Sequence, residues 1–289
     1  MSVGTNFNTF CSRLWMGDTA NTILQRYHLI TKRINEDFYG INSDTQHSLY
    51  VGSYGRGTDI RTSDIDMLVI LPPEIYWRYD SYSANGQSAL LQAVKTSLQR
   101  TYPKSYMRGD GQVIKIDFND GINFEIVPAF LNNGGSFTYP DTHNNGSWKV
   151  TNPKSEIAAL NLKNKATNKN LKRLCRMIRA WRETINIDIP GILIDTLAYN
   201  FIENWEYNDK SYVYYDYMSR DFFKYLMDIK SDQSYWLAPG SANRVYKKDN
   251  FHNSAKVAYQ LALDAIKNEQ YPSTACKIWR KIYGTKFPF

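Results

Sequence analysis

The chain has 289 residues and a formal net charge of +7, and 15% of its residues are aromatic. Its longest apolar stretch, Met67 to Pro73, is too short to cross a bilayer, and the N-terminus lacks the basic-then-apolar layout of an export signal. Three scattered cysteines, with no CxxC pair, favour a cytoplasmic location and argue against a zinc site.

The length of the chain predicts two packed lobes, because it exceeds what one ordinary core accommodates. The positive charge favours partners that carry phosphate, without distinguishing nucleotides from nucleic acid. The basic residues are dispersed along the chain and form no tail.

The first predicted element is an amphipathic helix from about Asp18 to Tyr39, in which apolar residues recur at helical spacing. A short apolar strand, Leu49 to Val51, leads into Gly52-Ser53 and a glycine-rich turn that extends to Gly57. Such a turn lets backbone N–H groups and a hydroxyl approach a phosphate closely. Arg56 in this turn could also face the phosphate, but a surface position is the expected one. Gly52 and Ser53 are therefore candidate phosphate-binding residues.

Asp64 and Asp66 follow, at the start of the apolar run that forms the second predicted strand. Residues two apart on a strand point to the same face, so these two carboxylates repel each other and lose hydration. A divalent cation removes that cost, and oxygen ligands of this kind suit Mg²⁺. A phosphate-binding turn followed by metal-binding carboxylates predicts nucleotidyl transfer.

After a predicted helix from Ser88 to Tyr102, two alternating runs flank Asn119-Asp120-Gly121 and predict a β-hairpin with a three-residue loop. In this register one face of the hairpin is apolar, and the opposite face carries Lys115, Asp117 and Glu125. A two-residue loop would set apolar residues against polar ones, so the pattern itself selects the longer loop.

The stretch from Asn132 to Pro153 is rich in Gly, Asn and Pro, and we predict that it connects the two lobes. The first lobe then covers residues 1–150 and the second covers residues 151–289. From Lys154 onward the pattern predicts helices to the end of the chain.

In the second lobe, the predicted helix Asn170–Thr184 has an apolar face and a separate charged stripe. The stripe consists of Lys172, Arg176, Arg179 and Glu183. From the residues alone, this stripe is either a solvated face or a surface that binds an anion.

The arrangement of GS, spacer and DxD resembles the signature of the polymerase-β-type nucleotidyltransferases, which place a third acid on a later strand. Their third-acid motif is an Asp followed by two apolar residues and Pro, and the matching stretch here is Glu125-Ile126-Val127-Pro128. Glu125 is therefore the expected third acid, although it departs from the usual Asp by one methylene. Asp117, one cross-strand pair nearer the hairpin tip, is the competing candidate.

Further segments narrow the resemblance to the CD-NTases, bacterial relatives of cyclic GMP-AMP synthase and oligoadenylate synthase in antiphage signalling. These segments are GSYGRGTDIRTSDIDMLV, GDGQVIKIDF, FEIVPAF, SWKVTNPKSEI, LKRLCRMIRAW and WRKIYGTKFP. The resemblance implies an α+β fold: a polymerase-β-like nucleotidyltransferase lobe with a mixed sheet and helices, and a C-terminal helical lobe. The active site would lie in the cleft between them.

The resemblance also implies a two-metal reaction that joins nucleoside triphosphates into a cyclic di- or oligonucleotide and releases pyrophosphate. The implied ligands of two Mg²⁺ ions, for which Mn²⁺ can substitute, are Asp64, Asp66 and Glu125. The implied triphosphate-binding residues are Gly52, Ser53, Arg176 and Arg179. The product would act on an effector protein, and we expect neither an obligatory nucleic-acid activator nor a membrane partner.

Two alternatives stay open. The first is a template-independent transferase that extends an RNA end or another acceptor, since such enzymes share GS and DxD. The second is a catalytically inactive relative that binds nucleotides or nucleic acid, an alternative that the Glu at position 125 keeps open. The bases are not predicted. The candidate base contacts, each with ordinary packing as the more frequent role, are Tyr54, Trp148, Asn152, Tyr199 and Tyr235.

Overall fold

The computed structural model describes residues 2–15, 17–61 and 64–289. The chain divides into two compact units, which we call the sheet unit (residues 17–55 and 62–154) and the helical unit (residues 1–16, 56–61 and 155–289). The chain therefore crosses between the two units several times. The sequence predicted a single division, after residue 150.

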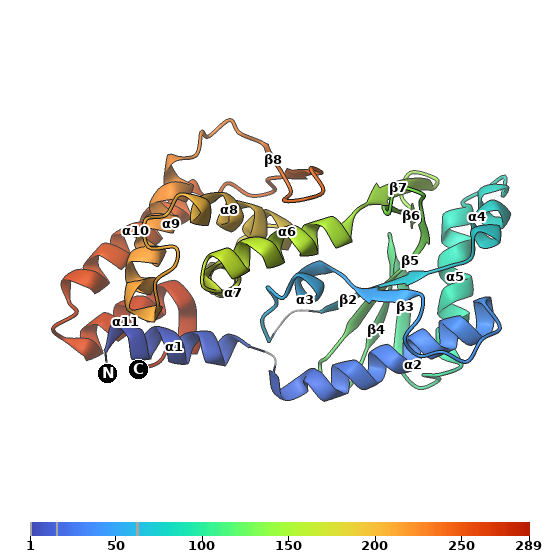
Figure 1. The fold of residues 1–289 in the computed structure, drawn as a ribbon, viewed down its shortest axis with the longest axis horizontal. Helices are drawn as coiled ribbons and strands as arrows, with labels where there is room; N and C mark the ends of the chain where they lie inside the picture. The colour runs from blue at the N-terminus through green and yellow to red at the C-terminus, as the bar shows by residue number, and fades with distance from the viewer. Residues whose placement is uncertain (1, 16, 62–63) are drawn as a thin grey trace. The chain divides into compact units, whose positions relative to one another are not determined.

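In the described part of the chain, the sheet unit contains one seven-stranded mixed sheet, coloured from blue to green in Figure 1. Its strands are β1 (Ser48–Tyr50), β2 (Ile65–Ile70), β3 (Tyr106–Asp110), β4 (Val113–Asp117), β5 (Phe124–Leu131), β6 (Phe137–Asp141) and β7 (Ser147–Thr151). The strand order is β1-β2-β5-β4-β3, and β6 pairs with both β5 and β7. Strands β2 and β5 run parallel to each other, whereas the other pairs are antiparallel.

Helices α2 (Ala20–Phe38), α4 (Pro73–Asp80) and α5 (Gly86–Gln99) belong to the same unit. Helix α2 buries Ile23, Ile30 and Ile34 along one face, because these residues recur at helical spacing. It contacts α5 and β2, while α5 contacts β3, β4 and β6, so these two helices cover the sheet. The predicted helices at Asp18–Tyr39 and Ser88–Tyr102 are confirmed within a few residues.

The predicted hairpin is also confirmed. Strands β4 and β5 pair Ile116 with Phe124 and Lys115 with Glu125, which is the register of a three-residue loop. Gly121 has a φ of +76°, so it occupies the left-handed position that such a loop requires.

The stretch Asn132–Pro153, in contrast, is not a connection between lobes. It forms the antiparallel strands β6 and β7, which extend the sheet from β5. The turn between these strands holds Asn144 and Asn145 at positive φ. The Gly and Asn residues that suggested a linker are therefore the residues of tight turns.

The helical unit is built mainly from α-helices, coloured dark blue at the N-terminus and green to red toward the C-terminus in Figure 1. They are α1 (Val3–Leu14), α6 (Pro153–Ala166), α7 (Asn170–Ile185), α8 (Gly191–Glu203), α9 (Tyr215–Asp228), α10 (His252–Lys267) and α11 (Pro272–Tyr283). Short 3-10 turns cover Tyr212–Tyr214 and Gly284–Lys286 in this unit and Gly17–Thr19 in the sheet unit. In the described parts of the chain, none of the helices has the length and apolar character needed to span a membrane.

One prediction for this region is wrong: the chain after Lys154 is not helical throughout. Strands β8 (Tyr235–Leu237) and β9 (Arg244–Tyr246) form an antiparallel hairpin between α9 and α10. The strands are only three residues long, which is too short for an alternating pattern to reveal.

Helix α1 belongs to the helical unit because its apolar residues complete that unit's core. Phe7 is fully buried and makes edge contacts with the rings of Trp279 and Phe287, at centroid distances of 5.1 and 5.2 Å. The two ends of the chain are therefore packed together.

Phe7→Ala should lower the free energy of unfolding by about 3–5 kcal/mol, because it leaves a cavity among aromatic rings. Chemical denaturation checks this value, with Asn8→Ala as the control at an exposed position of the same helix. Equal stability of the two variants would show that α1 is not part of this core.

Candidate functional site

The acidic residues of the site lie on neighbouring strands of the sheet unit. In the parallel pair β2–β5, Asp66 is the register partner of Glu125. Adjacent strands are about 4.8 Å apart, so these two side chains start from neighbouring positions. Asp64 lies one residue before β2 begins, two positions from Asp66.

The electrostatic environment shows that these carboxylates interact. Loss of hydration and the nearby carboxylate of Glu125 raise the pKa of Asp64, against the opposing effects of Lys115 and of a hydrogen bond with Asn123. Lys115, the cross-strand partner of Glu125, places its Nζ 2.8 Å from Glu125 Oε1. That bond is the main reason why the pKa of Lys115 is raised. One ammonium group therefore partly neutralises a cluster of acids.

Asp117, the competing third acid, is engaged elsewhere. It pairs in register with Tyr106 of β3, and its Oδ2 lies 2.6 Å from an Nη atom of Arg108. Glu125, in contrast, is the direct neighbour of Asp66. This placement favours Glu125 as the third acid, and its catalytic role stays a prediction.

Gly52 is fixed directly against Asp66. The backbone N–H of Val51 donates to the carbonyl of Asp66 at 2.9 Å, which brings the start of the GS segment onto β2. Gly52 has a φ of +57°, and a Cβ at this position would lie 1.7 Å from Asp66 Oδ2. Both the backbone conformation and the available space therefore require glycine here.

The glycine-rich turn that the sequence predicted is a short helix, α3 (Gly52–Arg56), whose Gly55 N–H donates to the carbonyl of Val51. Arg56 at its end is not at the surface: only 6% of this residue is exposed. It belongs to the helical unit, so the boundary between the units falls within α3.

The donor atoms suit a hard divalent cation, because Asp64, Asp66 and Glu125 offer carboxylate oxygens from neighbouring strand positions. Among the described residues, however, no group of three or more Asp, Glu, His or Cys side chains is gathered closely enough to hold a metal ion. Glu125 is turned toward the Lys115 ammonium. An ion held by all three acids would have to replace that ammonium at Glu125.

The basic stripe of α7 lies in the helical unit. Arg176 donates from Nε to the carbonyl of Asp59 at 3.0 Å and from Nη2 to the carbonyl of Gly57 at 2.9 Å. It therefore contacts the segment that follows the GS helix.

Arg179 has a different environment from the one expected. Only 1% of the residue is exposed, and its guanidinium binds both carboxylate oxygens of Asp195 at 2.6 and 2.9 Å. This burial does not support direct binding of a triphosphate by Arg179. The sequence reasoning missed Asp195, although one acid within the apolar run GILIDTLA of α8 was a signal that a buried partner was needed.

Lys172 is a candidate that the sequence reasoning did not select from the stripe. Its Nζ lies 2.6 Å from Asn161 Oδ1 and would be 2.9 Å from a Cβ added to Gly57, so it lies beside the same segment as Arg176. Burial and the nearby Arg176 lower the pKa of Lys172. Arg176 therefore binds Gly57, and the ammonium of Lys172 lies beside it.

Trp148 and Tyr199, two of the five candidate base contacts, make contacts with protein side chains. Trp148 donates its indole N–H to Asp80 and packs against the ring of Tyr76. Tyr199 lies under the ammonium of Lys163, at 4.8 Å from ring centroid to Nζ. For Tyr54, Asn152 and Tyr235, base binding stays a prediction.

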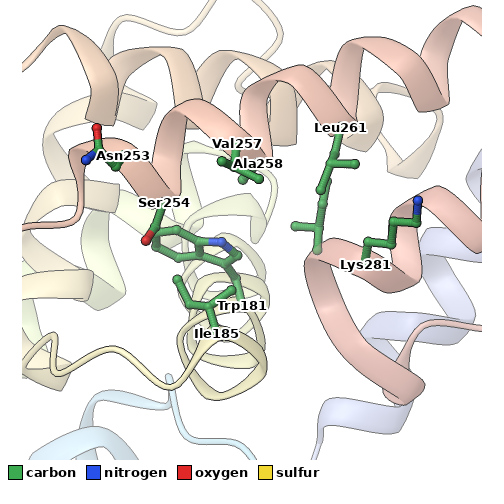
Figure 2. A pocket seen from close by; sticks show the side chains of 9 residues that line it. Trp181, Ile185, Asn253, Ser254, Val257, Ala258, Leu261 and Lys281 are labelled. Carbon is green, nitrogen blue, oxygen red and sulfur yellow. The ribbon is translucent and has the colours of Figure 1, made fainter.

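A cavity of about 240 Å³ lies elsewhere in the helical unit, between α7, α10 and α11. Figure 2 shows Trp181 and Ile185 on α7 and Leu261 on α10 along its walls, with Lys281 of α11 at one side. Its lining is mainly apolar and contains no acid, so it does not contribute to the chemistry described above.

Comparison with solved structures establishes the class of fold. CdnC of E. coli MS115-1, solved in a complex with HORMA-deltaN, has a TM-score of 0.71 and 16% identity over 99% of this chain and 98% of CdnC. The Bradyrhizobium diazoefficiens CD-NTase CdnG, in complex with GTP, has a TM-score of 0.70 and 11% identity over 97% and 94% of the two chains. For Vibrio cholerae DncV in the 3'-deoxy ATP bound form, the TM-score is 0.65 and the identity 14%, over 84% and 69%. The polymerase-β-like α+β fold is thus confirmed.

The family follows from the sequence match. The family model of the Second Messenger Oligonucleotide or Dinucleotide Synthetase (SMODS) domain matches residues 1–164, which is more than half of the chain. The chain belongs to this family, and its resemblance to the bacterial CD-NTases is confirmed. No curated protein sequence matches it.

Gly52→Ala should lower the free energy of unfolding by about 1–2 kcal/mol or more, because it combines a disfavoured φ with a clash against Asp66. Thermal or chemical denaturation checks the change. Gly134→Ala is the matched control, since Gly134 has no positive φ and no atom within 4 Å of an added Cβ. If both alanines are tolerated equally, Gly52 does not lie against Asp66.

Proposed function

We propose that this protein is a Mg²⁺-dependent nucleotidyltransferase that joins nucleoside triphosphates into a cyclic di- or oligonucleotide second messenger for bacterial antiphage signalling. Membership of the SMODS family supports the class of reaction. The observation that carries the proposal for this chain is the pairing of Asp66 with Glu125 on neighbouring parallel strands, with Gly52 packed against Asp66. Acids in this arrangement need a cation, and a divalent ion that they hold can bind the phosphates of a nucleotide.

The acidic residues would bind the metal. Asp64, Asp66 and Glu125 are the proposed ligands of two Mg²⁺ ions, which Mn²⁺ can replace. When bound, such ions neutralise charge on the phosphates and lower the pKa of an acceptor hydroxyl. Lys115 partly neutralises Glu125, because its ammonium lies 2.8 Å from Glu125 Oε1.

The residues proposed to bind the triphosphate are Gly52 and Ser53 of the GS segment and Arg176 and Lys172 of α7. A charge-assisted hydrogen bond from such groups contributes about 1.5–3 kcal/mol. Arg179 would support this site only indirectly, because its guanidinium is bound to Asp195.

The proposed partners are nucleoside triphosphates as substrates and an effector protein that binds the cyclic product. Structures of CdnC with ATP and of CdnE with GTP and Apcpp agree with such substrates. CdnC also forms a complex with HORMA-deltaN. We propose a cytoplasmic enzyme without an obligatory nucleic-acid activator.

The metal-site proposal predicts that the double variant Asp64→Asn, Asp66→Asn makes no product, because the metal loses two of its charged ligands. Purified protein is incubated with labelled nucleoside triphosphates and Mg²⁺, treated with phosphatase and analysed by chromatography. The wild type should give a phosphatase-resistant small product. Unchanged turnover in the double variant would contradict the metal site, and label on added RNA would favour a template-independent transferase instead.

The third acid is tested separately. Glu125→Gln should lower the rate at least about 100-fold, because the amide keeps the shape of the side chain but loses the negative charge that binds a divalent ion. Asp117→Asn is the matched control on the neighbouring strand and should stay close to the wild-type rate, because Asp117 is held by Arg108. An inactive Asp117→Asn with an active Glu125→Gln would reverse the assignment.

A further inference from the structure

The segment Arg56–Arg61 joins the GS helix to the DxD strand, yet it belongs to the helical unit. Ile60, which is fully buried, is part of the hydrophobic core of that unit together with residues of α7 and α8. The segment between the GS and DxD motifs is therefore fixed to the helical unit by contacts of its own, and the proposed chemistry does not explain these contacts.

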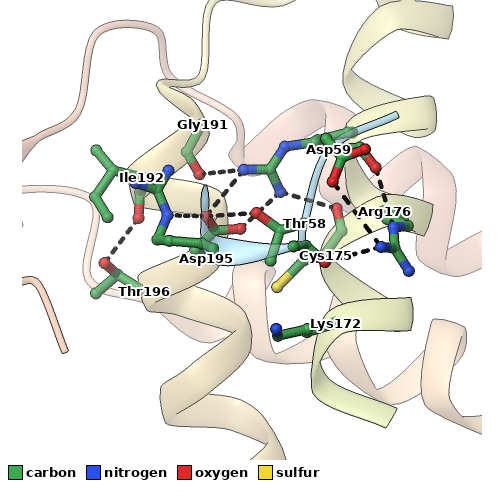
Figure 3. A network of polar contacts seen from close by, with 12 residues as sticks. Thr58, Asp59, Lys172, Cys175, Arg176, Gly191, Ile192, Asp195 and Thr196 are labelled. Atoms are coloured by element: carbon green, nitrogen blue, oxygen red, sulfur yellow. Dashed lines mark hydrogen bonds and ion pairs between the residues drawn. The ribbon is translucent and has the colours of Figure 1, made fainter. Parts of the chain in front are cut away.

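A buried carboxylate forms the centre of these contacts. Asp195 of α8 is fully buried and accepts hydrogen bonds from Arg56 Nε at 2.8 Å and from Thr58 Oγ1 at 3.0 Å. The guanidinium of Arg179 binds the same carboxylate from α7. Figure 3 shows Thr58 beside Asp195, with dashed lines marking the contacts of this network.

The positive and negative charges of this cluster are equal in number. Burial alone would raise the pKa of Asp195, but Arg179 and Arg56 outweigh it and hold the pKa well below the usual range. Glu156, at the start of α6, lies 3.6 Å from Arg56 and accepts a hydrogen bond from Ser241 in the β8–β9 turn. Two arginines and two acids thus compensate each other away from water.

Outside this cluster, Arg176 binds the carbonyls of Gly57 and Asp59. The segment is therefore held at its side chains by Asp195 and at its backbone by Arg176. A buried ion pair contributes little net stability compared with apolar packing, so its value lies in the position that it imposes on the bonded groups.

We infer that Asp195 is a positioning residue for nucleotidyl transfer, which acts through Arg56 and Thr58 on the segment between the GS and DxD motifs. Arg56 is the last residue of α3, so holding its guanidinium fixes the end of the helix that begins with Gly52-Ser53. The inference rests on the proposed function, because it assigns the network a role in that reaction.

The first test removes only the hydrogen bond from Thr58 to Asp195 and leaves the bonds of Arg56 and Arg179 to that carboxylate in place. Thr58→Val keeps the shape of the side chain but not its hydroxyl, whereas Thr58→Ser keeps the hydroxyl. Loss of a hydrogen bond to a charged group corresponds to about a tenfold effect. We expect Thr58→Val to lower kcat about tenfold, with Thr58→Ser close to the wild type.

Hydrogen exchange measured by mass spectrometry supplies a readout that does not depend on activity. Peptides that cover residues 52–61 should exchange faster in Thr58→Val than in Thr58→Ser, because the segment opens locally more often. Asp195→Asn should lower kcat further and make the same peptides exchange still faster than Thr58→Val does. Asp216→Asn is its control, since Asp216 is also a buried acid of the helical unit, and burial raises its pKa to about 7.

The outcomes separate the two claims. Equal exchange and equal kcat in Thr58→Val and Thr58→Ser would overturn the positioning role, as would an Asp216→Asn variant that reproduces Asp195→Asn. A wild type without turnover, but with faster exchange in Thr58→Val, would overturn the proposed function, while Asp195 would still position the segment without a role in nucleotidyl transfer. Faster exchange together with lower kcat in Thr58→Val supports both.

Discussion

The parallel pairing of β2 with β5 is the constraint on which the sheet unit's chemistry depends. It makes Asp66 the register partner of Glu125, so the fold places two carboxylates side by side on neighbouring strands. Such an arrangement raises the free energy of the folded chain unless cations lie nearby. Lys115 supplies one positive charge at Glu125, and the absence of a Cβ at Gly52 leaves the room that Asp66 needs. The fold therefore concentrates negative charge at β2 and β5 and places one ammonium group beside it.

The helical unit has the complementary arrangement, with arginines gathered around a carboxylate. Arg56 and Arg179 converge on Asp195 from segments far apart in the sequence, and both are almost completely buried. Arg176 is less buried and binds backbone carbonyls, so its guanidinium can exchange partners at a lower cost than that of Arg179. Two arginines of α7 thus have different environments. Arg179 is buried and bound to Asp195, whereas Arg176 is less buried and bound to backbone carbonyls.

Much of the sheet unit could be predicted, because the local alternation of apolar and polar residues determines its strands and their register. The alternation of apolar and polar residues around Asn119-Asp120-Gly121 was sufficient to predict the pairing of Lys115 with Glu125. The β6–β7 hairpin was mistaken for a linker, since the Gly and Asn residues that form its turn also occur in loops. The burial of Arg179 could not be read from its charged stripe, because its partner lies on the next helix. Helical spacing identifies a face, but tertiary packing decides whether that face meets water.

The central claim is that the acids on β2 and β5 share a metal site. The most direct measurement is anomalous scattering from crystals of the full chain containing Mn²⁺ and a non-hydrolysable nucleoside triphosphate. The account predicts Mn²⁺ density bounded by the carboxylates of Asp64, Asp66 and Glu125, with Lys115 displaced from Glu125. Density elsewhere, or a Glu125 that remains bound to Lys115 while the nucleotide is present, would contradict it.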